Sequence, residues 1–200
     1  MTETKRGRPR QYDRGEALDR ATAAFWARGY SATTLDDLVA AMGMNRPSIY
    51  NAFGDKEAVY RLALEHFVEQ MRTTVSERVL AEPKLEKALR NLYAGALDVY
   101  FDEERALGCF VFCTAPAEAV HLPEVRAIVA ALIEELDELL ARKFRDAAGR
   151  RRGAAGRDPR LSAKLAQAVL HSLALRARAG ESRSALERMA RAAAATLAAD

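Results

Sequence analysis

Residues 34–53 read TLDDLVAAMGMNRPSIYNAF, and their pattern is the strongest indication of a fold in the sequence. Its first apolar residues recur at the i, i+3, i+4, i+7 spacing of an amphipathic helix that stops at Gly43: Leu35, Leu38, Val39 and Met42. Thr34 is placed to cap this helix, with Asp37 at the third position favouring the helix dipole and reaching back. Gly43 and Met44 alone separate it from a second short helix over 45–53. A helix, a tight glycine turn and a short helix are the sequence form of a helix-turn-helix.

The residue content of the second helix favours DNA as its partner. Asn45 is a suitable N-cap, and Ile49 and Phe53 are predicted to face inward. The side chains left exposed are donors suited to phosphates and base edges: Arg46, Ser48, Tyr50 and Asn51. A helical hairpin alone is a weak signal, and these donors are what strengthens it.

Outside this stretch, glycine and proline residues separate further segments whose apolar residues recur with helical periodicity. One helix is predicted over 14–28, ending at Gly29, and Asp55 caps a longer one that runs on towards Val79. Another is predicted over 85–100. The run Gly108–Cys113 is ambiguous between strand and buried helix, and with helices on both sides we assign it to a helix that Pro116 should kink or interrupt.

Three more helices are predicted towards the C-terminus. The first has Pro123 near its start and Gly149 past its end, and the second is opened by Asp158 and Pro159 and ends at Gly180. The last has Ser184 and Glu187 as a capping box. With 41 alanines, three isoleucines and eleven valines among 200 residues, the composition also favours helix over sheet. The predicted fold class is therefore all-α, with about nine helices.

The formal net charge of +3 hides an uneven distribution. Residues 1–14 carry +3 and residues 142–160 carry +6, so the rest of the chain carries −6. No apolar run approaches the 18 or so residues of a membrane span, and no secretory signal is recognisable. We therefore expect a cytoplasmic protein without a membrane partner, and two cysteines do not make a disulfide framework.

Residues 11–71 resemble the DNA-binding domain of the TetR/AcrR family of bacterial transcriptional regulators. The resemblance is carried by GYSATTLDDLVAAMGMNRPSIYNAFGDKEA, residues 29–58, with its turns and caps in register. Two departures are small: Pro47 stands where the family often has glycine, and Ala52 where it often has an aromatic residue. The resemblance implies an N-terminal three-helix DNA-binding domain over 11–71, with the helix-turn-helix at 34–53. It also implies a helical effector-binding and dimerisation domain over 72–200.

Carried over by position, the resemblance implies a role for each residue of the reading surface. Thr34, Tyr50 and Lys56 would contact phosphates, although Thr34 is a helix cap in any case and Tyr50 has packing on the helix surface as its alternative. Arg46 and Ser48 would reach base edges, and Pro47 would pack on a thymine methyl group. Asn51 would read a base or a phosphate, or else is simply solvated. The large apolar residues of this part are assigned to its core: Phe25, Trp26, Ile49 and Phe53.

A basic arm precedes the first helix. Residues 6–10 read RGRPR, and Arg-Gly-Arg-Pro is the core of an AT-hook, which lies in the narrow minor groove of A/T-rich DNA. Arg8 and Arg10 are therefore candidate DNA contacts. The alternative is a basic tail over 1–10 that attracts DNA without reading its sequence.

The last two helices are candidates for a dimer interface. Their apolar faces would pair with a two-fold mate as a four-helix bundle, or else close the core of the protomer. The candidate interface residues are Leu165, Val169, Leu173, Leu186, Ala190, Ala193 and Leu197. A helix-turn-helix reader needs two half-sites about one helical turn apart, which favours the dimer.

In relatives the C-terminal part also houses a small-molecule pocket. Apolar or soft residues on the middle helices are the candidates for its lining: Phe67, Met71, Tyr93, Tyr100, Phe101, Cys109, Phe112 and Cys113. The spacing of Cys109 and Cys113 invites a redox sensor, but buried cysteine usually acts as a small hydrophobe. The three histidines lack ligand spacing, so no metal is predicted. The sequence also has no cofactor fingerprint, so no other cofactor is predicted. The loop with Arg150, Arg151 and Arg152 is either solvated or a second anionic contact, and the sequence assigns no role to the larger basic segment 142–160.

The leading hypothesis is a dimeric repressor that binds a palindromic operator on double-stranded DNA and is released by a small, hydrophobic effector. A helical enzyme or carrier for a small molecule is the alternative from another class, but no nucleophile with a base and no cofactor fingerprint supports it. An architectural DNA binder that uses the arm is a third alternative. We therefore expect no catalytic residues.

Overall fold

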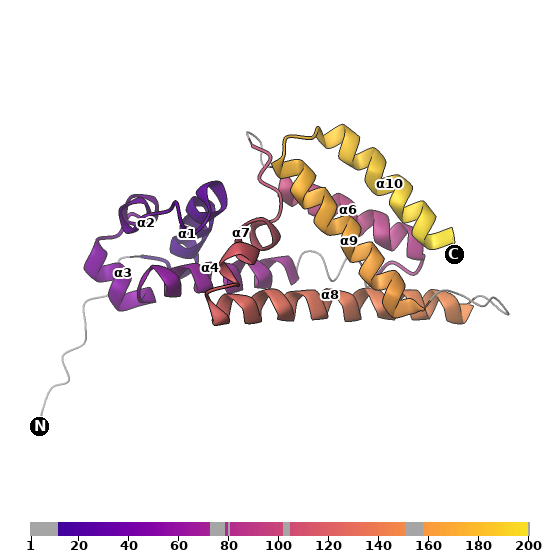
Figure 1. Cartoon of the computed structure of the whole chain (residues 1–200), viewed down its shortest axis with the longest axis horizontal. Coiled ribbons are helices and arrows are strands. Elements are labelled where there is room, and N and C mark those ends of the chain that lie inside the picture. The colour runs from indigo at the N-terminus through magenta and orange to yellow at the C-terminus, as the bar shows by residue number, and fades with distance from the viewer. Residues whose placement is uncertain (1–11, 73–78, 80, 102–104, 151–157, 200) are drawn as a thin grey trace, which may run out of the picture.

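The structure is a computed structural model, and it describes residues 12–72, 79, 81–101, 105–150 and 158–199. Within these ranges it contains nine helices and no strand, as the sequence predicts (Figure 1). The helices are α1 (Arg14–Arg28), α2 (Leu35–Met42), α3 (Arg46–Phe53), α4 (Lys56–Met71), α6 (Leu85–Tyr100), α7 (Phe110–Glu118), α8 (Pro123–Arg150), α9 (Pro159–Arg178) and α10 (Arg183–Ala199). The arm with Arg8 and Arg10, the predicted extension of α4 over 73–78 and the basic run 151–157 lie outside the described residues.

Local capping explains why α2 and α3 begin and end where they do. Thr34 and Asp37 form the predicted capping box, in which the Thr34 hydroxyl accepts from the Asp37 amide and the Asp37 carboxylate accepts from the Thr34 amide. Gly43 ends α2 in the left-handed conformation, with φ of +64°. Asn45, two residues after Gly43, then accepts from the Ser48 amide through its side chain, and α3 begins at Arg46. This short glycine turn fixes the geometry of the predicted helix-turn-helix.

An aromatic cluster joins these helices to the second half of the chain. The Tyr60 ring of α4 lies 4.9 Å from Phe25 of α1 and 6.0 Å from Phe110 of α7. Trp26 was expected in the core of residues 11–71 alone, but its ring packs against Phe67 and Phe110, so it lies at the junction. Phe25, Ile49 and Phe53 are buried as predicted. Buried residues before and after residue 71 therefore form one continuous hydrophobic cluster.

The C-terminal half is a layer of long helices. α8 and α9 pack along each other, and α10 packs against α6 and α9 at the end of the molecule far from α3 (Figure 1). Helix α8 continues through Gly149 to Arg150, instead of stopping before Gly149 as predicted. A glycine near a helix end costs only roughly 1 kcal/mol relative to alanine, which is too little to stop the helix by itself.

Two further helix starts differ from prediction. The run 108–113 is helical only from Phe110, because Gly108 adopts φ of +66° and passes so close to α9 that an added Cβ would lie 2.3 Å from the Ala174 carbonyl oxygen. α7 then runs through Pro116 instead of breaking there, and ends two residues later. In α10, the predicted capping residue Ser184 lies inside the helix, and the Ser182 hydroxyl accepts from the Ala185 amide instead.

Candidate nucleic-acid interface and internal cavity

Helix α3 is held firmly on the rest of the predicted DNA-reading domain (residues 11–71, the reading domain). Ile49 and Phe53 point into the core, and Arg14 at the start of α1 donates to the Ala52 carbonyl oxygen at 2.8 Å. The Arg14 guanidinium also lies 4.7 Å from the centre of the Phe53 ring. The last turn of α3 is therefore fixed by contacts that leave its opposite face free.

That opposite face carries most of the residues predicted to meet DNA. Arg46, Pro47, Tyr50 and Asn51 are exposed, whereas Ser48 is half-buried. Tyr50 is among the few large exposed apolar side chains in the described part of the chain. The first helical positions of α3 therefore present polar and aromatic groups outward, at the end of the molecule farthest from α10 (Figure 1).

Arg46 is paired with a residue that the sequence did not single out. Its Nε and Nη2 atoms both donate to the carboxylate of Asp36, in the first turn of α2, at 2.7–3.1 Å. The carboxylate raises the pKa of Arg46, chiefly by accepting these hydrogen bonds. The two residues are ten positions apart across the glycine turn, and no helical spacing predicts such a contact.

The two predicted phosphate contacts at helix starts also have partners inside the protein. The Thr34 hydroxyl donates to Asp37 at 2.7 Å, and these hydrogen bonds are the main reason why the pKa of Asp37 is lowered. The Lys56 ammonium lies 4.3 Å from the centre of the Tyr30 ring. The Lys56 side chain, at the start of α4, is therefore held against the Tyr30 ring instead of extending into solvent.

A small cavity of about 80 Å³ lies among α4, α6, α7, α8 and α9. Five of the eight predicted pocket residues line it: Phe67, Met71, Tyr100, Cys109 and Phe112. The remaining lining comes from residues that the sequence did not single out, which are Val68, Arg72, Leu92, Ala96, Val99, Leu132, Glu135, Leu136, Leu139 and Leu170. Its walls are thus almost wholly apolar.

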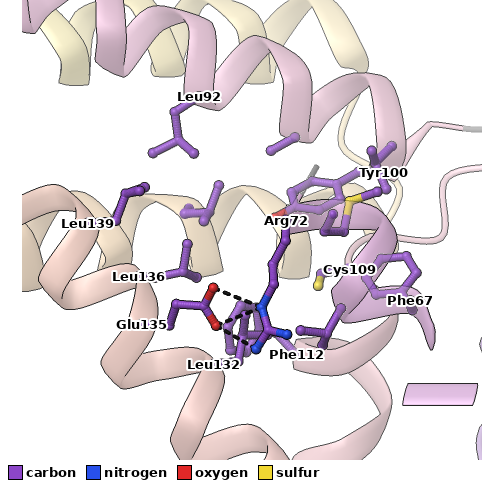
Figure 2. A pocket seen from close by; sticks show the side chains of 15 residues that line it. Phe67, Arg72, Leu92, Tyr100, Cys109, Phe112, Leu132, Glu135, Leu136 and Leu139 are labelled. Carbon is purple, nitrogen blue, oxygen red and sulfur yellow. Dashed lines mark hydrogen bonds and ion pairs between the residues drawn. The ribbon is translucent and has the colours of Figure 1, made fainter. Parts of the chain in front are cut away.

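Arg72 and Glu135 supply the charged groups of this cavity. Arg72, which follows the last turn of α4, donates from Nε and Nη2 to the Glu135 carboxylate of α8 at 2.8–3.0 Å (Figure 2). Its Nη1 atom donates to Glu69 at 2.9 Å. Both carboxylates raise the pKa of Arg72, Glu135 more than Glu69. This ion pair ties the end of α4 to α8 beside the cavity.

Three predicted pocket residues lie elsewhere. Tyr93 is buried in the core and donates to the Ala166 carbonyl oxygen at 3.1 Å. Phe101 lines a separate, more open groove of about 490 Å³ between α1, α4 and the end of α6. Cys113 does not line the cavity and, like Cys109, is a free cysteine. Burial raises the pKa of Cys109 to about 12 and also raises that of Cys113, so both thiols stay protonated near neutral pH and are poor nucleophiles.

The candidate interface residues divide into two groups. Leu173, Leu186 and Ala190 are buried inside the protomer, so they belong to its core and not to a surface. Val169, Ala193 and Leu197 are half-buried, and Leu165 is exposed. The buried positions of α10 are explained by its packing against α6 and α9, which the sequence pattern alone does not distinguish from packing against another subunit.

Direct contacts link the second half of the chain to the reading domain. Arg178, the last residue of α9, donates from Nη1 to the carbonyl oxygens of Trp26 in α1 and Leu107, at 3.1 and 3.0 Å. The Tyr60 and Thr114 hydroxyls form a buried hydrogen bond of 2.8 Å between α4 and α7. Burial raises the pKa of Tyr60 to about 12, so its phenol keeps its proton.

Neither a metal centre nor a membrane segment emerges from the described residues. No group of three or more His, Cys, Asp or Glu side chains there is arranged to hold a metal ion. None of the described helices combines the length and apolarity needed to cross a bilayer.

Comparison with known proteins identifies the family. Residues 17–63 match the model for bacterial regulatory proteins of the TetR family. The chain is 36% identical over 112 residues to the transcriptional repressor ComR of Escherichia coli and 30% identical over 119 residues to the regulator YezE of Bacillus subtilis. These matches span 53% and 61% of the two curated relatives, so they cover little more than half of their length.

A solved structure extends the likeness to nearly the whole chain. A cysteine mutant of the TetR family regulator CifR, bound to a 26-base-pair operator duplex, is 30% identical and superposes with a TM-score of 0.80. The match covers 94% of this chain and 98% of that one. The helix-turn-helix, the fold and these relatives agree, and the chain belongs to the TetR family of bacterial transcriptional regulators.

Proposed function

We propose that this protein is a dimeric repressor that binds a palindromic operator and releases it when a small hydrophobic molecule occupies the internal cavity. The observation that carries the proposal is the outward face of α3, where Arg46, Tyr50 and Asn51 project from a helix fixed by Arg14 and by its own buried residues. The operator complex of CifR supports DNA as the partner of this face. Residues 11–71 would read DNA, and residues 72–200 would bind the effector and the second subunit.

The exposed stripe of α9 supports the dimer. Its residues, all exposed except the half-buried Ser172, recur at spacings of four and three, the heptad pattern of a helix seam that packs against another helix: Leu161, Leu165, Ala168, Ser172 and Leu175. The three leucines are 52%, 41% and 57% exposed in the protomer. Contact with the same stripe of a second copy would remove this apolar surface from water and set two α3 helices at a fixed separation.

The cavity supports effector control, because helix α4 connects it to the reading surface. The start of α4 packs near α3, its Lys56 contacts Tyr30 between α1 and α2, and its end is tied to α8 by Arg72 and Glu135. A ligand larger than the cavity of about 80 Å³ enters only if surrounding side chains move, and Arg72 is the longest of those that line it. Binding would thus shift the end of α4, change the spacing of the two reading helices and lower the affinity for the operator.

Selection of bound duplexes from random DNA tests the proposal directly. We expect a palindrome, bound with a mobility shift that is lost in the double variant Arg46→Ala, Asn51→Ala. The matched control is Arg90→Ala, Asn91→Ala on α6, which changes the same residue types and the same net charge far from α3. Selection without any preferred sequence, or equal loss in both double variants, would refute sequence reading by α3.

We infer no catalytic step for this protein, because its function as proposed needs only binding equilibria. The regulators among its relatives support this inference. We place it in the cytoplasm, where its DNA partner would lie.

A further inference from the structure

We propose that Asp36 and Arg46 act as one unit that reads guanine, with Asp36 as the residue that positions the guanidinium. This proposal rests on the proposed function, because it assigns a specificity to the DNA-reading face of α3. Asp36 lies in the first turn of α2 and Arg46 at the first position of α3. The glycine turn brings the two helix starts together at one edge of the reading surface.

The ion pair between Arg46 and Asp36 contributes little to the stability of the fold. The two side chains are 55% and 72% exposed, and exposed ion pairs contribute little to stability. The start of α2 is already secured by the capping box of Thr34 and Asp37, in which Asp36 takes no part. A carboxylate on a surface that meets phosphates also weakens binding by repulsion. Asp36 also favours the dipole of α2 from its first turn, but this effect needs no contact with Arg46, so the pairing is explained better by what it does to Arg46 than by what it does to the fold.

The geometry leaves one edge of the guanidinium ready for a base. Nε and Nη2 face Asp36, whereas Nη1 has no partner within the described part of the chain. Three hydrogen bonds from two nitrogens to one carboxylate fix both the plane and the direction of the guanidinium, so that Nη1 points away from Asp36. The two N–H groups of Nη1 are then free to donate towards the O6 and N7 acceptors that guanine presents side by side in the major groove, and guanine is the base that arginine contacts most often.

The proposal makes a residue-specific prediction about base preference. In Arg46→Ala, discrimination against the other bases at one position of each half-site falls by roughly 5- to 150-fold, the range of a good bidentate contact. In Asp36→Ala, discrimination falls at that same position, while affinity for random DNA rises because a repulsive charge is gone. Asp36→Glu, which keeps a carboxylate that reaches Arg46, restores part of the preference.

The experiment measures dissociation constants for a set of operator duplexes with each base substituted in turn. It uses the full-length wild type, the variants above and the double variant Asp36→Ala, Arg46→Ala, each checked by thermal unfolding. If Asp36 acts through Arg46, the double variant has the base profile of Arg46→Ala alone. The control is Glu16→Gln on α1, which removes the carboxylate of an exposed ion pair with Arg20 and the same unit of charge.

Each outcome decides the proposal. Loss of preference at one shared guanine position supports it. An unchanged base profile in Asp36→Ala, or the same change in Glu16→Gln, overturns it, and so does a change at a position that Arg46 does not affect, because Asp36 would then read a base itself. A wild type that selects no sequence at all is a different result, and it refutes the proposed function.

Discussion

Truncation of one leucine in the exposed stripe of α9 tests the dimer quantitatively. Leu165 is 41% exposed in the protomer, so that fraction of its side chain remains to be buried by a second subunit. Changing leucine to alanine removes about three carbons, each worth roughly 0.8 kcal/mol when fully buried. At 41% exposure the loss is about 1 kcal/mol for each subunit.

Two-fold symmetry doubles this loss, because each copy contributes its own Leu165 to the interface. Leu165→Ala should therefore weaken dimerisation by about 2 kcal/mol, which raises the dissociation constant roughly 30-fold. Leu165→Glu should give monomers, since it places two carboxylates near a two-fold axis in an apolar seam. Monomers would bind a full palindrome no better than a half-site.

Sedimentation equilibrium over a wide range of protein concentration measures these constants. Val120 supplies the matched control, because it is 68% exposed, lies just beyond α7 and is not part of the stripe. Val120→Ala should leave the dissociation constant unchanged. A dimer that is equally stable in the wild type, Leu165→Ala and Leu165→Glu would refute the assignment of this stripe, and another face would then hold the two subunits together.

Three further perturbations test one buried hydrogen bond, one buried histidine and one exposed ion pair. Tyr60→Phe removes the buried hydrogen bond to Thr114 and should lower the free energy of unfolding by about 1 kcal/mol in urea titrations, with Thr114→Val adding less in the Tyr60→Phe background than alone. Additive effects would show that the two hydroxyls act separately. Burial lowers the pKa of His171, so the unfolded chain takes up protons first as the pH falls below about 6.5. The free energy of unfolding should therefore decrease from pH 7.5 to 5.5, and His171→Leu should reduce that decrease, whereas equal pH dependence in both proteins would contradict this. Glu135→Gln releases Arg72 on the cavity side and, because the pair is exposed, should weaken operator binding by roughly 1.5- to 5-fold in fluorescence titrations without effector. Unchanged operator affinity would argue against this pair as a tie on α4.

The parts of the fold that sequence predicts well are those set by residues three or four positions apart. The Thr34 and Asp37 capping box, the Asn45 cap and the cap of α9 by Asp158 followed by Pro159 all form as predicted. Such patterns are local, because a side chain can reach the backbone amides of the next turn in any context. The start of α10 is the exception, since Ser182 and Ser184 are both good caps. Packing of that helix, which no local pattern contains, selects Ser182.

The parts that sequence misses are contacts between distant segments. Arg72 and Glu135 are 63 positions apart, and Arg178 and Leu107 are 71 apart, so no periodicity connects them. Helix α9 shows a second limit, because it has two apolar stripes. One, with Leu173, is buried in the protomer, and the other, with Leu165, is exposed. Both stripes have helical spacing, and only the positions of α8 and α10 decide which one faces the core.

The contacts at the two ends of the reading domain suggest how effector and operator binding would be coupled. Arg178 holds the end of α1 through the Trp26 carbonyl oxygen, and it belongs to α9, the helix that carries the proposed dimer stripe. Arg72 holds the far end of α4, beside the cavity. A ligand that displaces Arg72 leaves the contact of Arg178 intact, so the reading domain would pivot about the end of α9 instead of detaching. A pivot changes the separation of the two α3 helices while the dimer persists. By linkage, the operator would then weaken effector binding by the same factor that the effector weakens operator binding.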